Sequence, residues 1–267
     1  MASLVSLDLH CHILPGIDDG AKTIEDSEVL ARRLVEIGIS HVVCTSHIQA
    51  DLYPNTRATL LPLVASTQAH FDAVGIPLKL VAGSEVRMDQ ESCVPESWLT
   101  IGDLGKHVLV EMPPGMPLIG SMDALLFDLQ ARGITPIIAH PERQAPLQKD
   151  PEILARWVDR GILAQGTLCA LAGAASERTV MTLEGFLQRG LIAFMGSDAH
   201  NVDRRIRDLD QAVIRLEEVV GAENARLIRF QNPQALLTGE PIIRPAPYTP
   251  PVAPGLFQRF LTSFKRA

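Results

Sequence analysis

An amphipathic segment that ends in a glycine and continues into a short apolar run occurs five times in this chain. The glycines are Gly38, Gly75, Gly133, Gly161 and Gly190. Glycine tolerates the left-handed backbone conformation that closes many helices, so each junction predicts a helix end followed by a strand. The runs that follow, with pairs such as Val42 and Val43, are almost continuously apolar, as expected for strands buried on both faces.

Two further strands are predicted at residues 4–10 and 107–111, which brings the number to seven. Helix-start signals are present as well, in the capping box of Thr23 and Asp26 and in the pair Asn232 and Pro233. Alternating helices and strands are typical of parallel strands joined by helical crossovers. Seven such units in about 240 of the 267 residues favour an α/β barrel over an open sheet.

The composition changes near residue 241. Six of the 19 prolines fall between Pro241 and Pro254, which predicts a stiff extended linker. Apolar residues then recur at helical spacing with basic residues between them: Leu256, Phe257, Phe260, Leu261 and Phe264. We therefore expect a barrel domain over residues 1–240 and a tail over residues 241–267 that holds the proline-rich linker and a short amphipathic helix. The sequence leaves open whether that helix docks on its own barrel, contacts a partner or a membrane surface, or stays disordered.

The composition also excludes several classes of protein. With 24 Lys and Arg against 31 Asp and Glu, the net charge of −7 argues against a nucleic-acid binder held by phosphate contacts. No apolar run reaches the roughly 18 residues of a membrane span, and the first residues, MASLVSLDLHCH, lack the features of a secretory signal. The four cysteines are scattered without a C-x-x-C pair, so we expect a cytoplasmic protein without a disulfide framework.

Side chains that bind metals stand at the carboxyl ends of six of the seven predicted strands. In chain order they are His10 and His12, His47, Glu85, Glu111, His140, and Asp198 and His200. The sixth strand, which ends near Gly166, offers nothing comparable. Because the carboxyl ends of the strands in a parallel barrel meet at one mouth, we expect these side chains to converge there.

The spacing and chemistry of these residues predict a metal site. Residues two apart on a strand point to the same face, so His10 and His12 share one face while Cys11 packs on the other. Imidazole and carboxylate ligands together suit zinc, manganese or iron. Asp19, in the stretch PGIDDGAKT, is interpreted as a further ligand that folds back over the mouth, although a plain Asp-Gly turn needs no metal. About three divalent ions would overcompensate the four carboxylates and leave a mouth that attracts an anion.

Arginines follow two of these ligand positions. Arg143 lies three residues after the histidine of the fifth strand, where its guanidinium is placed to hold phosphate oxygens, and Arg204, Arg205 and Arg207 follow the last ligand. The phosphate-binding loop G-x-x-x-x-G-K-S/T is missing, and no cysteine has an arginine six residues later. A phosphatase on this chain must therefore use metal ions instead of a cysteine nucleophile.

These motifs together resemble a known family. The segments DLHCHILPGIDDGA, TSH, GSE, VE, AHPER and SDAHN, with NPQALLTGE near residue 240, are similar to the PHP (polymerase and histidinol phosphatase) superfamily. Within it they most resemble the manganese-dependent tyrosine-protein phosphatases of bacterial capsule and exopolysaccharide gene clusters. The resemblance covers residues 4–240 and implies a distorted seven-stranded, TIM-like (β/α)7 barrel with a trinuclear metal site. The proline-rich tail lies outside it.

The resemblance also implies the ligands of three divalent ions, manganese by preference and iron or zinc as alternatives. It assigns His10, His12, Glu85 and Asp198 to one ion, Glu85, Glu111 and His140 to a second, and Asp19, His47 and His200 to the third. It further implies that Arg143 and Arg205 bind the phosphoryl group. The Ile206 and Arg207 that follow Arg205 depart from the two prolines usual in the family.

The implied reaction is the hydrolysis of phosphotyrosine by direct attack of a metal-activated water on phosphorus, without a phosphoenzyme. The implied substrate is a tyrosine-phosphorylated protein, the cytoplasmic tail of an autophosphorylating kinase that controls polysaccharide export. The same site would serve a small-molecule phosphatase such as histidinol phosphatase. It would also serve an amidohydrolase, although Glu111 stands where such enzymes often have a modified lysine. The alternative from another class is a non-catalytic metal-binding module that docks on the kinase through the C-terminal helix.

Overall fold

The computed structural model describes residues 6–89, 95–113, 119–202 and 205–250. Its strands form two sheets, and every neighbouring pair of strands is parallel. The first sheet has the order β1 (Leu7–Cys11), β2 (His41–Cys44) and β4 (Lys79–Ala82). The second has the order β3 (His47–Ile48), β5 (Glu85–Arg87), β6 (His107–Glu111), β7 (Thr135–Ala139), β8 (Leu163–Thr167) and β9 (Phe194–Gly196).

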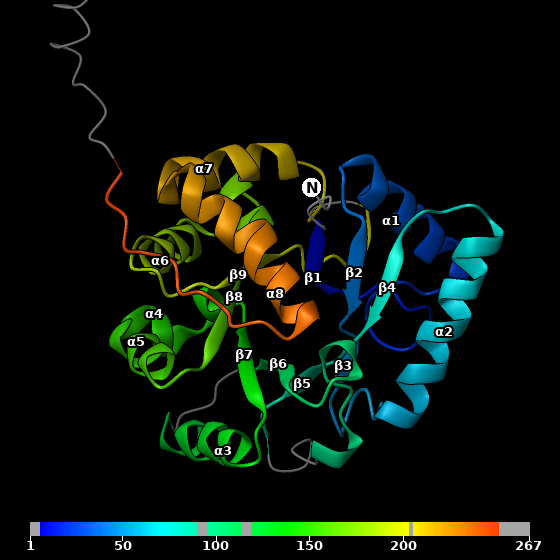
Figure 1. Cartoon of the computed structure of the whole chain (residues 1–267), viewed down its shortest axis with the longest axis horizontal. Coiled ribbons are helices and arrows are strands. Elements are labelled where there is room, and N and C mark those ends of the chain that lie inside the picture. The colour runs from blue at the N-terminus through cyan, green and yellow to red at the C-terminus, as the bar shows by residue number, and fades with distance from the viewer. Residues whose placement is uncertain (1–5, 90–94, 114–118, 203–204, 251–267) are drawn as a thin grey trace, which may run out of the picture.

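Helices surround these strands, as Figure 1 shows. Two helices, α1 (Ile24–Glu36) and α2 (Arg57–Ala73), lie beside the first sheet. The others are α3 (Ile119–Ala131), α4 (Ala145–Lys149), α5 (Glu152–Asp159), α6 (Glu177–Gln188), α7 (Leu209–Arg226) and α8 (Asn232–Thr238). This arrangement confirms the predicted α/β class with parallel strands. In the described part of the chain, none of the helices combines the length and apolarity that a bilayer crossing requires.

Each of the seven predicted strand regions contains a strand, but the second and third regions are split. β2 gives way to β3 after Cys44, and β4 gives way to β5 after Ala82. At the first break, the Thr45 hydroxyl accepts a hydrogen bond from the N–H of Cys11. At the second break, Gly83 is packed so closely that a β-carbon would lie 2.5 Å from Val43. These contacts depend on neighbouring strands and have no signal in the local sequence.

The buried apolar residues form two clusters. The larger one joins the strands to the surrounding helices, with Leu30 and Leu34 of α1 and Phe186 of α6 among its members. The smaller one, which we call the inner cluster, comes mainly from the strands: Leu7, Leu9, Val43, Ile101, Leu109, Ile137, Ala139, Ala193, Phe194 and Leu236. Burial of apolar side chains on both faces explains the near-continuous apolar runs of the sequence.

An irregularity in β1 sets the direction of the first predicted metal ligands. Leu7 and Leu9 belong to the inner cluster, whereas Cys11 belongs to the larger cluster. Strict alternation along a strand would put all three on one face, and the pairing of β1 with β2 is irregular between Asp8 and Cys11. Cys11 therefore packs away from the mouth, as predicted, and the histidines on either side of it face the mouth.

Most helix ends follow the sequence prediction. All five glycines at the predicted junctions have positive φ angles, between 65° and 87°. Thr23 and Asp26 form the predicted capping box of α1. The prediction that Asn232 caps the start of a helix is wrong. The chain is already helical there, because a π-helical turn over Leu227–Gln231 runs directly into α8.

Residues 240–250, after α8, form no helix or strand, and in Figure 1 this segment crosses in front of the strands. The Asn232 amide donates hydrogen bonds to the carbonyls of Ala193 and Ile243, and its Oδ1 accepts one from the N–H of Ile243. Farther along, the N–H of Tyr248 donates to the carbonyl of Gln188. This part of the tail is therefore attached to the strand-bearing unit. The predicted amphipathic helix lies outside the described residues.

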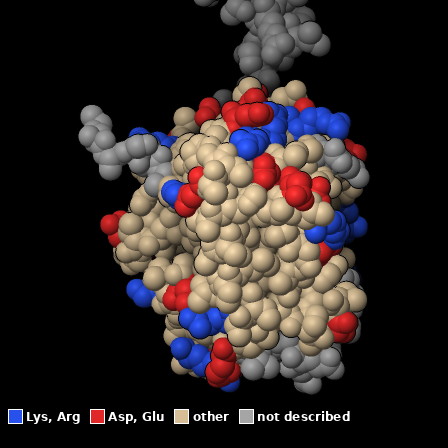
Figure 2. Space-filling model, turned by 90° about the vertical axis from the view of Figure 1, so that its right-hand side faces the viewer, with Lys and Arg blue, Asp and Glu red and all other residues tan. Residues whose placement is uncertain are grey.

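One side of the molecule carries few charges. Figure 2 looks onto the side that holds α2 and shows a broad uncharged area with charged residues around its margin. Between Arg57 and Asp72, α2 contains no Asp, Glu, Lys or Arg. The largest convergence of His, Asp and Glu side chains among the described residues lies elsewhere, at the carboxyl ends of the strands.

Candidate metal centre

The nine residues predicted as metal ligands all come together at the carboxyl ends of the strands. They form four overlapping groups in which the ligand atoms lie within 4.8 Å of one another. The groups are His12, Asp19, His47 and His200; His10, Glu85 and His140; His10, His12 and Asp198; and His47, Glu85 and Glu111. Residues from the first and the last strand regions therefore share one site.

Glu85, the first residue of β5, lies at the centre of this cluster. Its carboxylate oxygens lie 3.1 to 3.4 Å from ring nitrogens of four histidines, His10, His12, His47 and His140. Burial alone would raise the pKa of this carboxyl, but the surrounding imidazoles outweigh it and hold the pKa well below its usual range. Glu85 is thus ionised and shared between donor groups, as expected for a bridging ligand.

His10 and His12 direct their Nε2 atoms to the same point. The Nδ1 of His10 lies 2.9 Å from Gln165 Oε1. The Nδ1 of His12 lies 2.9 Å from Asp18 Oδ2. The two Nε2 atoms face each other at 3.2 Å, with Asp198 Oδ1 beside them at 3.3 and 3.6 Å. Burial opposes protonation of these rings, but nearby carboxylates that include Glu85 raise the pKa of both, so a cation bound here would take the place of protons.

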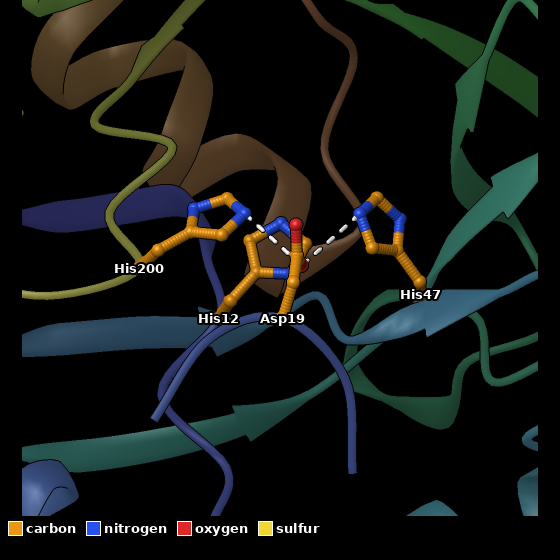
Figure 3. A group of neighbouring side chains, drawn as sticks. All are labelled: His12, Asp19, His47 and His200. Atoms are coloured by element: carbon orange, nitrogen blue, oxygen red, sulfur yellow. Dashed lines mark ion pairs between the residues drawn. The ribbon is translucent and has the colours of Figure 1, made fainter. Parts of the chain in front are cut away.

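A third group lies nearer the surface, as Figure 3 shows. Asp19 Oδ1 lies 3.2 Å from His200 Nε2 and 3.5 Å from His47 Nε2, between the two rings. The Asp19 side chain is 47% exposed, so this group faces the mouth. The hydrogen bond with His200 lowers the pKa of Asp19, and burial lowers the pKa of His47 to about 4. An ionised carboxylate and a neutral imidazole are the protonation states that a metal ion requires.

The pKa of Glu111, the last residue of β6, shifts in the opposite direction from that of Glu85. Burial and the nearby Glu85 carboxylate raise the pKa of Glu111 to about 7. The Nε2 of His140 lies 3.7 Å from its carboxylate, beyond ordinary hydrogen-bond distance. The Glu85 carboxylate therefore disfavours the ionisation of Glu111, and a divalent cation between the two would be stabilising. Five imidazoles and four carboxylates are ligands that suit manganese, iron or zinc, so the residues present fit a divalent metal.

Two of the candidate ligands adopt a backbone conformation that is uncommon outside glycine. His140 has a φ of 34°, and Asp198 has a φ of 54°. The Asp198 residue is held in place in part by a hydrogen bond of 2.8 Å from its N–H to the carbonyl of His10. Such conformations cost about 1–3 kcal/mol each and persist only where the surrounding structure fixes them. Strain at two ligand positions indicates that the strand ends are shaped by a function.

Both predicted phosphate-binding arginines reach the cluster. Arg143 donates to Asp198 Oδ2 at 2.6 Å and to the Thr167 hydroxyl at 3.1 Å. Arg205 lies 2.6 Å from the other oxygen, Asp198 Oδ1, and 2.8 Å from His200 Nδ1. The two arginine side chains are 33% and 34% exposed. Each guanidinium therefore lies between a buried ligand and the mouth, where it can contact an anion.

The sequence left open which of Arg204, Arg205 and Arg207 lies near the metal cluster, and the structure narrows that choice. Arg207 is exposed at the surface, and Arg204 lies outside the described residues. Ile206 is fully buried and anchors the segment between them. Among the described arginines of this segment, Arg205 is therefore the one directed toward the cluster.

Two residues that support the histidines were not predicted. Asp18, which stands beside Asp19 in the sequence, accepts from His12 and also from the N–H of His47 at 3.1 Å. Gln165 belongs to the sixth strand region, so the expectation that this strand contributes nothing comparable is incomplete. Metal-binding histidines commonly donate their second N–H to a carboxylate or carbonyl oxygen. A search for such oxygens near the strand ends would have pointed to both residues.

Known proteins with similar sequences include named phosphatases. The tyrosine-protein phosphatase YwqE of Bacillus subtilis is 32% identical over 245 residues, which cover 90% of this chain and 95% of YwqE. The tyrosine-protein phosphatase CpsB of Streptococcus pneumoniae is 24% identical over 239 residues, which cover 86% of this chain and 98% of CpsB.

Solved structures show the same relationship. A chain from the crystal structures of YwqE and CpsB, described as metal-dependent tyrosine phosphatases, matches with a TM-score of 0.82 and 32% identity. The match covers 91% of this chain and 99% of that chain. The β-aspartyl dipeptidase of Fervidobacterium islandicum AW-1 matches with a TM-score of 0.52 at 15% identity, over 90% of this chain and 77% of the dipeptidase. This second likeness concerns the fold alone.

A family profile confirms the resemblance that the sequence motifs indicated. The profile described as capsular polysaccharide synthesis, CpsB/CapC, matches residues 6–238, which contain all nine candidate ligands and both arginines. The chain therefore belongs to the CpsB/CapC family.

Proposed function

We propose that this chain is a metal-dependent phosphatase that hydrolyses phosphotyrosine in proteins. The observation that carries the proposal is the convergence of nine metal-ligating side chains and two arginines at one mouth. The relatives named as tyrosine-protein phosphatases support this reaction, and the family's description supports a setting in capsular polysaccharide synthesis.

Three divalent ions, manganese by preference, are proposed for the cluster. The ligand sets are His10, His12, Glu85 and Asp198; Glu85, Glu111 and His140; and Asp19, His47 and His200. Such ions, when bound, lower the pKa of water toward neutrality and offset the charge of phosphoryl oxygens. Iron and zinc are the alternatives, because they accept the same mixture of imidazole and carboxylate.

Polar residues around the ligands have separate tasks in this proposal. Arg143 and Arg205 hold the phosphoryl oxygens through their guanidinium N–H groups, which now contact the Asp198 carboxylate. Asp18 and Gln165 keep the proton of each supported imidazole on Nδ1, so that Nε2 stays free to bind a cation. Protein side chains therefore bind and orient, and the attack on phosphorus is assigned to water.

The cysteine within electrostatic range of both arginines is a poor candidate for a nucleophile. Burial raises the pKa of the Cys169 thiol, even though Arg143 and Arg205 act in the opposite direction. The residue is 7% exposed. A protonated and largely buried thiol supports direct attack by water, without a phosphoenzyme.

The proposed substrate is the phosphorylated cytoplasmic tail of a tyrosine kinase that controls polysaccharide export. A phenol has a pKa of about 10, so it leaves more readily than the alcohol of a serine ester and needs less help from a general acid. We also propose that residues 1–240 form the phosphatase domain and that residues 241–267 supply a contact with the partner or with a membrane surface. The cytoplasm is the proposed location.

We further infer that the two sheets belong to one distorted barrel of seven βα units. β2 runs into β3 and β4 runs into β5, and these continuations link the first sheet to the second. At the other edge, Cys11 and Ala199 form a parallel bridge, and the N–H of His12 donates to the carbonyl of Ala199 at 2.8 Å. These links support a sheet that curves back toward its first strand.

The substrate class is tested with manganese-loaded protein in side-by-side assays. We expect kcat/KM for a phosphotyrosine peptide to exceed that for histidinol phosphate by about tenfold or more. Faster turnover of histidinol phosphate would instead support a small-molecule phosphatase. Inactivity toward both substrates would support a non-catalytic metal-binding module. Turnover in isotopically labelled water with trapping of intermediates tests the direct attack, and a covalent phosphoprotein would refute it.

A further inference from the structure

The loop between β3 and α2 is held firmly at the edge of the metal centre. Gln49 and Tyr53 pair through two backbone hydrogen bonds of 2.9 and 2.8 Å. The Asn55 side chain donates to the carbonyl of His47 at 2.8 Å and to that of Ile17 at 2.9 Å. These bonds tie the far end of the loop to two segments that carry candidate ligands.

A second clamp holds the tip of the loop from the neighbouring strand. Arg87, two residues after Glu85 on β5, forms an ion pair with Asp51 at 2.6 Å and donates to Gln49 Oε1 at 3.4 Å. The Gln49 amide donates in turn to the Glu111 carboxylate at 3.5 Å. The Arg87 side chain is 15% exposed and that of Asp51 is 55% exposed, so the ion pair joins a largely buried guanidinium to the surface of the loop. Arg87 and Gln49 thus connect the loop to β5 and β6, the strands that carry Glu85 and Glu111.

Tyr53 is placed by this loop directly over a candidate metal ligand. Its ring stacks on that of His47, with the centroids 5.5 Å apart and the planes inclined by 12°. The ring is only partly buried, so it rests on the imidazole and keeps some surface open to solvent.

We propose that Tyr53 is a specificity-determining residue that packs against the aromatic ring of an aryl phosphate substrate. This inference rests on the function proposed above. A phosphoryl group held beside the cluster leaves its phenyl ring next to the ligands at the mouth, and His47 belongs to two of the donor groups there. Aromatic pairing stabilises a complex by an amount that corresponds to about 2- to 10-fold in affinity. A phosphoserine or polyol phosphate has no ring to place there.

A purely structural role for Tyr53 leads to a different expectation. If the ring only positions His47, its loss weakens metal binding and slows the hydrolysis of every substrate alike. If the ring contacts the substrate, its loss acts on aryl phosphates and spares alkyl phosphates. The ratio of kcat/KM for an aryl and an alkyl phosphate therefore separates the two roles.

The experiment compares wild type with Tyr53→Leu, Tyr53→Phe and Leu52→Ala, each loaded with manganese to a measured content. The substrates are phenyl phosphate and glycerol phosphate. We expect Tyr53→Leu to lower the aryl-to-alkyl ratio about 3- to 10-fold, mainly through a higher KM for phenyl phosphate, and Tyr53→Phe to keep it within about twofold. Leu52, 64% exposed in the same loop, is the matched control, and its truncation should leave the ratio unchanged.

An unchanged ratio in Tyr53→Leu would overturn the inference, whether or not the overall rate falls. A loss of metal content with equal slowing of both substrates would assign Tyr53 the structural role instead. If the wild-type protein hydrolyses neither substrate nor a phosphotyrosine peptide, the proposed function fails, and the inference fails with it.

Discussion

The carboxyl and amino ends of the strands differ in which residues adopt left-handed backbone conformations and in how closely charged side chains lie together. At the carboxyl ends, charged and polar side chains converge, and His140 and Asp198 adopt left-handed backbone conformations that glycine would adopt more easily. At the amino ends, glycines such as Gly133 and Gly190 take the left-handed positions where helices stop. There the side chain of Asn232 also pairs with backbone groups of the strands and the tail.

Backbone strain is thus present at the carboxyl ends of the strands, at His140 and Asp198, whereas glycines relieve it at the amino ends. Buried carboxylates close together and left-handed non-glycine residues both lower the stability of the protein without ions. The close carboxylates and two of the three left-handed non-glycine residues in the described ranges, His140 and Asp198, lie at the end where ions and substrate are proposed to bind, whereas the third, Asp103, lies before β6. Substitutions at the carboxyl ends should therefore change activity more than stability, and substitutions at the amino ends should do the reverse.

The largest effect is expected for Glu85→Gln at the carboxyl ends. Glu85 contacts four imidazoles, and the amide has neither the negative charge nor the second oxygen acceptor that a bridging ligand supplies. We expect phosphatase activity to fall about 10³-fold with a lower metal content, as measured by kinetics and elemental analysis. Circular dichroism should show the same fold. Activity within tenfold of wild type would contradict the proposal that Glu85 is a bridging metal ligand.

The next largest effect is expected for Gly190→Ala at the amino ends. Gly190 has a φ of 65°, and a β-carbon there would lie 2.1 Å from the carbonyl oxygen of Pro245 in the tail. We expect the free energy of unfolding to fall by about 2–3 kcal/mol, as measured by urea denaturation. The activity of the folded protein per bound metal should stay the same.

Gly133→Ala is the matched control for this substitution. Gly133 has a φ of 80°, but a β-carbon there would have nothing within 4 Å. It should therefore cost only the conformational contribution, about 1 kcal/mol. Equal losses in the two variants would show that the contact with Pro245 does not contribute, and a loss of activity per bound metal would break the contrast between the two ends.

A smaller effect than that of Glu85→Gln is expected for Asp18→Asn, which tests the residue that supports the His12 ligand. Asp18 accepts from the Nδ1–H of His12, and an amide accepts this hydrogen bond less strongly. We expect the affinity for manganese to fall about 10- to 100-fold, as measured by titration of the metal-free protein. Asp26→Asn, which removes the same charge in the exposed capping box of α1, should leave the affinity unchanged. Equal affinities of Asp18→Asn and wild type would contradict the supporting role.

Local signals explain which parts of this structure could be predicted from the sequence. The glycine junctions depend on the backbone preferences of single residues, so Gly38 and Gly190 predicted helix ends correctly. The split of the second strand region depends on the hydrogen bond between Thr45 and Cys11, residues from two strands. The proline content of the tail carried no information on the pairing of Ile243 with Asn232.

The candidate site shows the same division. The convergence of the candidate ligands was predictable because a parallel fold brings the carboxyl ends of its strands to one mouth. The adjacent Asp18 and Asp19 look alike in sequence, yet one accepts from His12 in the interior and the other lies between His47 and His200 at the mouth. Side-chain direction in a loop follows from tertiary packing, so the sequence could not separate their roles.

Removing the metal and adding it back tests whether phosphotyrosine hydrolysis depends on the proposed ions. Manganese is titrated into chelator-treated protein while bound metal and hydrolysis of a phosphotyrosine peptide are measured on the same samples. We expect activity below about 0.1% without metal, because the attack on phosphorus depends on water activated by the ions. We expect full recovery as occupancy approaches the proposed three ions per chain. Full activity in the metal-free protein, or no activity at full occupancy, would contradict the proposal.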